Sequence, residues 1–185
     1  MKEKRIAMDK LDVAITLAKR SPWLVSAAAL TVLDQWTKHL AAANLKETPR
    51  VLIPDVLELT YTENTGAAWS MLSGKQTLLI VITAVMLGAV LWALINGKWR
   101  HPVLQVGETL LIAGGLGNLI DRVWNDYVVD FIYVKAIDFP VFNVADCCVC
   151  CGAALLLVYV LFLEKGDARG DEKTADDTDG GGTAG

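Results

Sequence analysis

Residues 142–151, FNVADCCVCC, begin the apolar stretch that decides the fold of this chain. The stretch runs over about Pro140–Leu163, which is long enough for a helix to cross the roughly 30 Å of hydrocarbon in a bilayer. Its start carries an amide, Asn143, and a carboxylate, Asp146, and four cysteines follow. Two alternatives follow for the function of the protein: either the acid takes part in the chemistry, or the thiols do.

The rest of the chain also has the composition of a membrane protein. Hydrophobic residues make up 54% of its 185 residues, whereas soluble domains contain about 45–50% even when glycine is counted. Three further apolar stretches approach spanning length. Each is flanked by charged residues or by residues that commonly end a helix, such as Gly and Pro. We therefore predict an all-α integral membrane protein with four transmembrane helices, over about Pro22–Ala43, Gln76–Ile95, Val103–Ile120 and Pro140–Leu163.

The distribution of positive charge predicts the orientation in the membrane. Lys and Arg are more numerous on the side shared by the two termini than on the opposite side, and cytoplasmic loops carry this excess. Both termini are therefore expected in the cytoplasm. Residues 1–21 are expected to form a cytoplasmic segment with a short interfacial helix, residues 22–164 the membrane domain, and residues 165–185, which have almost no apolar side chains, a disordered tail.

Two segments on the outer side have the patterns of strands. Residues 57–62 alternate apolar and polar side chains, as a half-buried strand does. Pro54-Asp55 supplies a turn that would fold residues 51–53 back beside them. Residues 127–134 are rich in β-branched and aromatic side chains. A small extracytoplasmic β element, or cradle, is therefore expected at about residues 48–63 and 127–134.

Charged side chains interrupt the apolar stretches, and each one inside a bilayer costs about 2.5–3.5 kcal/mol unless it has a partner. Asp34 and Lys38 are four residues apart, so they are expected to pair on one helix face. Ala113 and Gly117, also four apart, form a small-residue step that lets another helix backbone approach closely. These two features predict closely packed helices around buried polar groups.

Amides and acids recur with the same spacing at the outer ends of two predicted spans. Asn118 and Asp121 are three residues apart at the end of the third span, next to Arg122. Asn143 and Asp146 repeat the spacing at the start of the fourth span. Two helices therefore present an amide and a carboxylate at similar depth, where they can face each other.

Two carboxyl groups held together in a poorly hydrated site cannot both ionise, so one keeps its proton while the other acts as a base. Such a pair suits peptide hydrolysis, in which one acid takes a proton from water and the other hydrogen-bonds the scissile carbonyl. Asp146 is one candidate, and its partner is Asp121, Asp126, Asp130 or Asp138. Spacing does not choose among these four, although the apolar neighbours of Asp130 favour a raised pKa there.

The cysteines and a transport function are weaker alternatives. Cys147, Cys148, Cys150 and Cys151 spread around more than half of one helix, whereas a tetrahedral metal needs ligands that converge on one point. We interpret them as small packing residues and expect Cys→Ser variants to keep activity. An ion or proton transporter needs acids along a route to both faces, but here the acids concentrate at the outer side.

Five sequence blocks resemble the motifs of the bacterial lipoprotein signal peptidases, which are the type II signal peptidases. The blocks are LDQWTK (33–38), NTGAAW (64–69), GGLGNLIDR (114–122), VVDF (128–131) and FNVAD (142–146). The resemblance implies an intramembrane aspartyl endopeptidase that cleaves diacylglyceryl-modified prolipoproteins just before the lipidated cysteine. It implies that Asp130 and Asp146 are the catalytic pair. The residues that it implies for substrate binding or support of the pair are Asp34, Asn64, Asn118, Asp121, Arg122 and Asn143.

The same resemblance implies a location in the bacterial cytoplasmic (inner) membrane, with the active site near the outer face and the β cradle over the substrate. No metal and no organic cofactor is expected. Lipid-modified prolipoprotein and membrane lipid are the expected partners, nucleic acid is not, and a globomycin-type inhibitor is expected to bind. The cysteine cluster and the acidic tail are not part of the family pattern.

Overall fold

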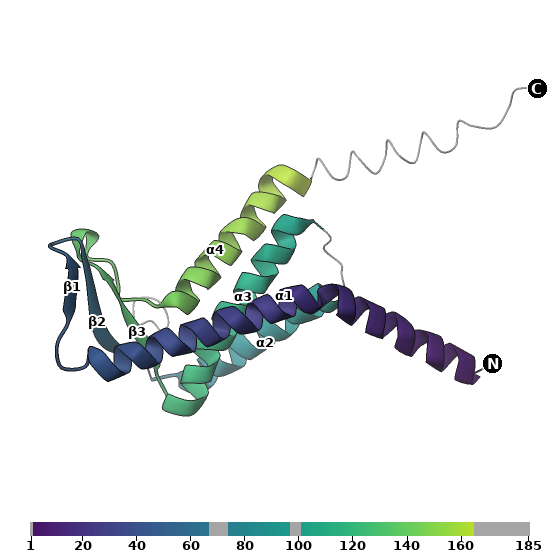
Figure 1. The fold of residues 1–185 in the computed structure, drawn as a ribbon, viewed down its shortest axis with the longest axis horizontal. Coiled ribbons are helices and arrows are strands. Elements are labelled where there is room, and N and C mark those ends of the chain that lie inside the picture. Colours follow the sequence, from purple (N-terminus) through teal and green to yellow (C-terminus); the bar gives the residue numbers. More distant parts are fainter. Residues whose placement is uncertain (1, 67–73, 97–100, 165–185) are drawn as a thin grey trace, which may run out of the picture.

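The computed structural model describes residues 2–66, 74–96 and 101–164. Residues 67–69 of the NTGAAW block and the tail 165–185 lie outside the described residues, so the disorder expected for the tail stays a prediction. The described chain forms helices packed side by side, with a small sheet at one end (Figure 1). The elements are α1 Lys2–Asn44, β1 Arg50–Ile53, β2 Leu57–Asn64, α2 Gln76–Asn96, α3 Pro102–Asn125, β3 Val128–Val134, the 3-10 turn η2 Lys135–Ile137, α4 Val144–Val158 and its π-helical continuation η3 Tyr159–Leu163.

Three of the described helices are long and apolar enough to cross a membrane: Gln76–Asn96, Pro102–Asn125 and Val144–Leu163. They correspond to three of the four predicted spans. The remaining predicted span, Pro22–Ala43, is the first along the chain and lies inside α1. It does not reach the same hydropathy, because Asp34, Gln35 and Lys38 interrupt it. Four transmembrane helices therefore stay a prediction, whereas a mainly helical fold with three helices of membrane-spanning length and composition is observed.

The N-terminal segment differs from the separate short helix expected within residues 1–21. It is helical, but it is continuous with the first predicted span in one helix that contains Pro22. Proline leaves the carbonyl four residues earlier without its usual N–H donor. Here the hydroxyl of Ser21 donates to that carbonyl, of Ala18, at 2.8 Å. The helix can therefore continue through Pro22, and the interfacial location of its first half stays a prediction.

Helix α3 is the central helix and contacts α1, α2 and α4. Glycines permit these close approaches. A Cβ at Gly114 would collide with the carbonyl oxygen of Ala145 on α4, and a Cβ at Gly117 would collide with Asp34 on α1. Gly117 belongs to the small-residue step predicted with Ala113, and its lack of a side chain lets Asp34 reach the space between three helices.

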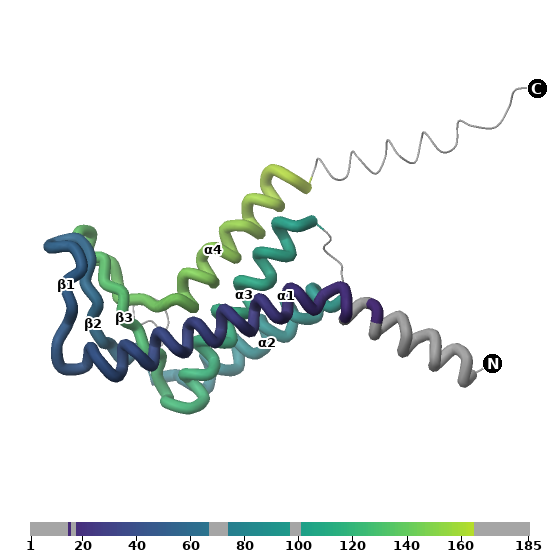
Figure 2. Tube along the Cα trace, in the orientation of Figure 1, coloured from purple at the N-terminus to yellow at the C-terminus, as the bar shows by residue number. Residues whose placement is uncertain are grey.

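The sheet is antiparallel with strand order β1-β2-β3, and it occupies the predicted positions. β1 folds back on β2 through the Pro54-Asp55 turn, where Asp55 has a φ of 56°. β2 pairs with β3 so that Thr62 lies opposite Asp130 and Asn64 opposite Val128. As Figure 2 traces, β1 follows α1 and β3 follows α3, so the sheet forms where these two helices end and α4 begins.

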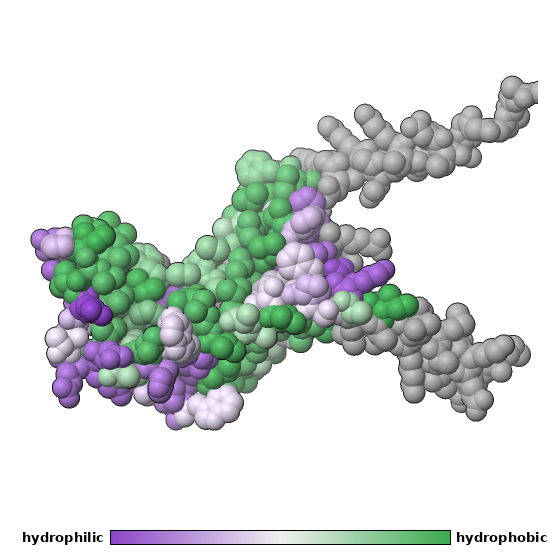
Figure 3. Space-filling model, viewed as in Figure 1, coloured by the Kyte–Doolittle hydropathy of each residue, from purple (hydrophilic) through white to green (hydrophobic). Residues whose placement is uncertain are grey.

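Apolar side chains cover much of the outer surface of the helices. Figure 3 shows mostly apolar surface along α4. Many of these large side chains are exposed to the surroundings of the protein, which suits a lipid environment because a soluble protein would bury them. They include Val81, Val85, Met86 and Trp92 of α2, and Leu157, Val160, Leu161 and Phe162 of α4 and η3.

Candidate active site

Asp130 lies in the middle of β3 and is only 2% exposed. Its carboxylate accepts two hydrogen bonds, from Asn64 Nδ2 at 2.9 Å and from Asn143 Nδ2 at 2.7 Å. The pKa of Asp130 is raised to about 6, and burial is the largest cause of the rise. The nearby charge of Asp146 contributes to this rise, while the bonds from Asn64 and Asn143 oppose it. Asp130 is therefore an acid that holds its proton more tightly than an exposed aspartate does.

Asp146 lies in the first turn of α4 and is held by a capping box. Its backbone N–H donates to Asn143 Oδ1 at 2.9 Å, and its carboxylate accepts from the Asn143 backbone N–H at 3.2 Å. The second carboxylate oxygen accepts from Asn118 Nδ2 at 2.8 Å. Because Asn143 contacts both acids through different atoms, Asp130 and Asp146 are fixed on either side of one buried amide.

The two acids line one cavity of about 560 Å³. Its wall includes both polar and apolar side chains, and most of the apolar ones come from the segment before α4. The cavity can therefore hold a molecule with both a polar and an apolar portion. Its lining consists of Thr62, Glu63, Asn64, Asn118, Arg122, Val128, Asp130, Phe139, Pro140, Val141, Phe142, Asp146, Val149 and Cys150.

Lys38 joins polar residues of two helices, α1 and α3. Its ammonium group lies 2.9 Å from Asp34, 3.0 Å from Asp121 and 2.9 Å from the Asn118 side-chain oxygen. The pair with Asp34 was predicted, but the contacts with Asp121 and Asn118 were not. With three donors and three acceptors, the buried ammonium has no unpaired N–H. Lys38 therefore orients the amide that donates to Asp146.

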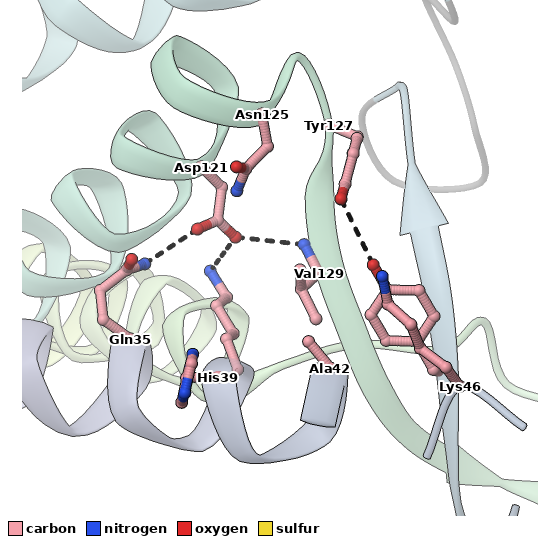
Figure 4. Close-up of a pocket in the computed structure, with 10 residues that line it drawn as sticks. Gln35, His39, Ala42, Lys46, Asp121, Asn125, Tyr127 and Val129 are labelled. Carbon is pink, nitrogen blue, oxygen red and sulfur yellow. Dashed lines mark hydrogen bonds and ion pairs between the residues drawn. The ribbon is translucent and has the colours of Figure 1, made fainter. Parts of the chain in front are cut away.

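Asp34 and Asp121 also bind backbone groups next to the two acids. Asp34 accepts from the Ala145 N–H at 2.8 Å, beside Asp146, and Asp121 accepts from the Val129 N–H at 3.1 Å, beside Asp130. Gln35, which was not predicted, donates to Asp121 at 3.0 Å. Figure 4 shows the bonds of Asp121 with Gln35 and Val129 in a smaller polar pocket of about 240 Å³. These bonds position the backbone that carries the acids.

Arg122 lines the cavity and also contacts the segment that follows β2. Its guanidinium donates to the carbonyl of Gly66 at 3.0 Å and to that of Asn118 at 3.3 Å. The Gly66 N–H in turn donates to the Asn64 side chain at 2.9 Å. Arg122 therefore fixes the segment that carries Asn64, and its Nε has no hydrogen-bond partner among the described residues.

The other acids considered from the sequence lie elsewhere. Asp126 is exposed and caps α3 with a left-handed φ of 64°. Asp138 is exposed and accepts from the Tyr133 hydroxyl at 2.7 Å. Asp121 lines the smaller pocket and not the cavity of Asp130. Of the four possible partners of Asp146, the structure brings Asp130 alone into the same cavity.

A further buried acid, Glu108, was missed from the sequence. It lies on α3 and is 0% exposed, and neither carboxyl oxygen has a hydrogen-bond partner within the described chain. It does not line either of the two pockets described above. The sequence could have indicated this acid, because a charged residue within a predicted membrane span is unusual.

Among residues 2–66, 74–96 and 101–164, no group of three or more His, Cys, Asp or Glu side chains is arranged to hold a metal ion.

Together these features define a helical membrane protein in which one buried acid, Asp130, and one half-buried acid, Asp146, line a single cavity where a small sheet meets the helix ends. The chain belongs to the signal peptidase II family, whose profile matches residues 26–162. This match includes every site residue described above, from Asp34 to Asp146.

Individual relatives agree with the family assignment. A lipoprotein signal peptidase of Enterococcus faecalis is 38% identical over 154 residues, which are 82% of this chain and 95% of that protein. One of Streptococcus thermophilus is 40% identical over 142 residues, which are 76% of this chain and 92% of the relative. A solved structure described as a bacterial membrane enzyme has a TM-score of 0.71 at 37% identity, and covers 76% of this chain and 88% of that chain.

Proposed function

We propose that the protein is an intramembrane aspartyl endopeptidase that removes signal peptides from diacylglyceryl-modified prolipoproteins by cleaving before the lipidated cysteine. The observation that carries the proposal is the shared cavity of Asp130 and Asp146, with Asn143 hydrogen-bonded to both acids. The names of the relatives, which are lipoprotein signal peptidases, support the substrate class.

In the proposed mechanism, Asp130 begins protonated and Asp146 begins ionised. Burial favours this assignment because it raises the pKa of Asp130, whereas Asp146 is only half-buried. Asp146 takes a proton from water as the water oxygen attacks the scissile carbonyl, and Asp130 donates its proton to the carbonyl oxygen. Collapse of the tetrahedral intermediate then breaks the C–N bond: Asp146 gives its proton to the leaving amine, and a hydroxyl of the intermediate returns a proton to Asp130 as the carboxylic acid product forms.

The supporting residues have proposed roles that follow from their contacts. Asn64 and Asn143 orient Asp130, and Asn118 orients Asp146. Arg122 lines the cavity and is proposed to bind a substrate carbonyl. Asp34 and Asp121 hold the backbone beside the two acids through the bonds described above.

The apolar part of the cavity suits the lipid end of such a substrate. It is lined by Phe139, Val141, Phe142 and Val149. Contact between acyl chains and apolar side chains is favourable, because it removes apolar surface from water. We propose the bacterial inner membrane as the location, with four spans, cytoplasmic termini and the acids near the outer face. The mechanism uses no metal or cofactor, and a globomycin-type inhibitor is proposed to occupy the same cavity.

The proposal is tested with purified protein in lipid vesicles and a diacylglyceryl-modified precursor, followed by gel shift. Asp130→Asn and Asp146→Asn are each expected to abolish processing while the protein still inserts and purifies. Asp126→Asn is the matched control, because this exposed residue has a left-handed backbone that asparagine tolerates. Normal processing by either of the first two variants would refute the assignment, and efficient cleavage of an unlipidated precursor would refute the substrate class.

A further inference from the structure

The four cysteines of α4 lie in different surroundings. Cys150 lines the cavity of the two acids and is exposed. It follows Asp146 by four residues, so the two side chains share one face of the helix. Cys147 and Cys151 are also exposed but do not line this cavity, and Cys148 is buried. One thiol of the cluster therefore borders the space in which the substrate is proposed to react.

The cavity has features of a space that receives a polar molecule. Arg122 lines it, is only 8% exposed, and keeps Nε without a hydrogen-bond partner among the described residues. A buried N–H without a partner costs free energy unless a ligand or water accepts from it. Asp130 and Asp146 border the same space. Water and small polar solutes are therefore expected to enter the cavity and to reach the Cys150 thiol.

Access to water controls the reactivity of a thiol, because the thiolate is the nucleophile and a thiol in lipid does not ionise readily. Cys147 and Cys151 are not among the residues that line the cavity, and the outer surface of their helix is largely apolar. Their thiols are expected to react slowly with water-soluble reagents. Cys150 is expected to react faster than either, although all three side chains are exposed.

We propose that Cys150 is a covalent modification site for small, polar, thiol-reactive electrophiles, and that an adduct on its sulfur blocks the cavity beside Asp146. With a methanethiosulfonate, the Cys150 thiolate attacks the reagent's sulfenyl sulfur. A disulfide bond forms, methanesulfinate leaves with the bonding electron pair, and the thiol proton passes to water. Only the activity readout of this proposal rests on the proposed peptidase function.

The test compares two variants in lipid vesicles with trimethylammonium-ethyl methanethiosulfonate. The first retains only Cys150 and has serine at positions 147, 148 and 151. The second is Cys150→Ser, which retains the other three cysteines. The measured quantity is the processing rate after treatment divided by the rate before treatment, so each variant is its own reference. Mass spectrometry of the α4 peptide locates the adduct.

The first variant is expected to lose about tenfold or more of its rate, since a group that displaces the substrate misaligns the reacting atoms. Dithiothreitol should restore this rate by releasing the adduct. The second variant should keep its own rate after treatment. Equal inhibition of both variants, or labelling of Cys151 in the second variant as fast as labelling of Cys150 in the first, would overturn the proposal. If neither untreated variant processes the precursor, the peptidase function fails, while the mass readout still decides the Cys150 site.

Discussion

Asn118 and Asn143 hydrogen-bond each other through their side chains, with Asn143 Nδ2 3.1 Å from Asn118 Oδ1. Each amide also donates to a different acid, Asn118 to Asp146 at 2.8 Å and Asn143 to Asp130 at 2.7 Å. A pair of amides from α3 and the start of α4 therefore sets the relative position of the two acids. This arrangement predicts that the amides matter for turnover beyond any contribution to folding.

The first prediction separates two roles of Asn143. Asn143→Ala removes the donor to Asp130 and the cap of α4, and loss of the cap costs about 0.5–2 kcal/mol. Asn143→Ser retains a capping oxygen for the Asp146 N–H but has no amide to reach Asp130. Both variants are expected to lose kcat by up to the order of a hundredfold, whereas the melting temperature should fall more in the alanine variant, which also loses the cap. Recovery of kcat in the serine variant would show that Asn143 acts as a cap alone.

The second prediction concerns Lys38. Lys38→Met would leave Asp34 and Asp121 buried without their shared cation, which costs about 3–5 kcal/mol. It would also release the Asn118 oxygen, so processing should fall even in the fraction that remains folded. Lys46→Met is the control, because Lys46 is exposed and its ammonium lies 4.8 Å from the centre of the Tyr61 ring. Thermal melts in detergent and processing assays in vesicles measure the two effects, and equal stability of the two variants would contradict the network.

The third prediction concerns the contact between α3 and α4. A Cβ in Gly114→Ala would meet the Ala145 carbonyl oxygen and, at 2.8 Å, a methyl group of Val149. The helices would have to separate, at about 1–3 kcal/mol, and Asn118 would move away from Asp146. Gly88→Ala on α2 is the matched control, because nothing lies within 4 Å of its added Cβ. Processing by the Gly114→Ala variant should fall, and undiminished melting temperature and rate would contradict the close packing.

The fourth prediction follows from the raised pKa of Asp130. The folded protein holds this proton more tightly than the unfolded chain, because the pKa rises from 3.8 to about 6. The proton therefore contributes stability that is complete below pH 3.8 and is lost as the pH rises through about 6. The contribution is at most about 3 kcal/mol.

Asp130→Asn removes this titration, so its melting temperature should fall less than that of the unchanged protein between pH 4 and about 7. Asp126→Asn should retain the dependence of the unchanged protein. Melts of the three proteins at several pH values provide the measurement. Parallel curves for all three would show that Asp130 does not titrate abnormally.

The sequence predicted the helical spans well because apolar length alone defines them. The α2 helix ends at Asn96, one residue beyond the predicted Gln76–Ile95. The α1 helix was harder, since the polar residues that complete the site lower its hydropathy, and since a local serine hydroxyl allows it to pass through Pro22. Such a local bond has no periodic signature in the sequence.

The acid pair could not be predicted from spacing, and the resemblance to a family was needed to select Asp130. The structure shows why spacing along the chain was not sufficient. Strand pairing and alternation place Val128 and Asp130 on the cavity wall, while Val129 packs with Ala41 of α1 and with Leu45, just after this helix. This choice of face depends on the long-range register between β2 and β3. The additional partners of Lys38 depend in the same way on helices that are distant in the sequence.

The order of the network residues along the chain governs when the site can assemble during membrane insertion. Asp34 and Lys38 are synthesised with the first helix, Asn118 and Asp121 with the third, and the Ala145 N–H and Asp146 only with the fourth. A nascent chain that lacks its last helix therefore holds partly compensated charges and no acid pair. Hydrolytic competence would appear in a single late step of biogenesis, after the whole helical part of the protein has been threaded into the bilayer.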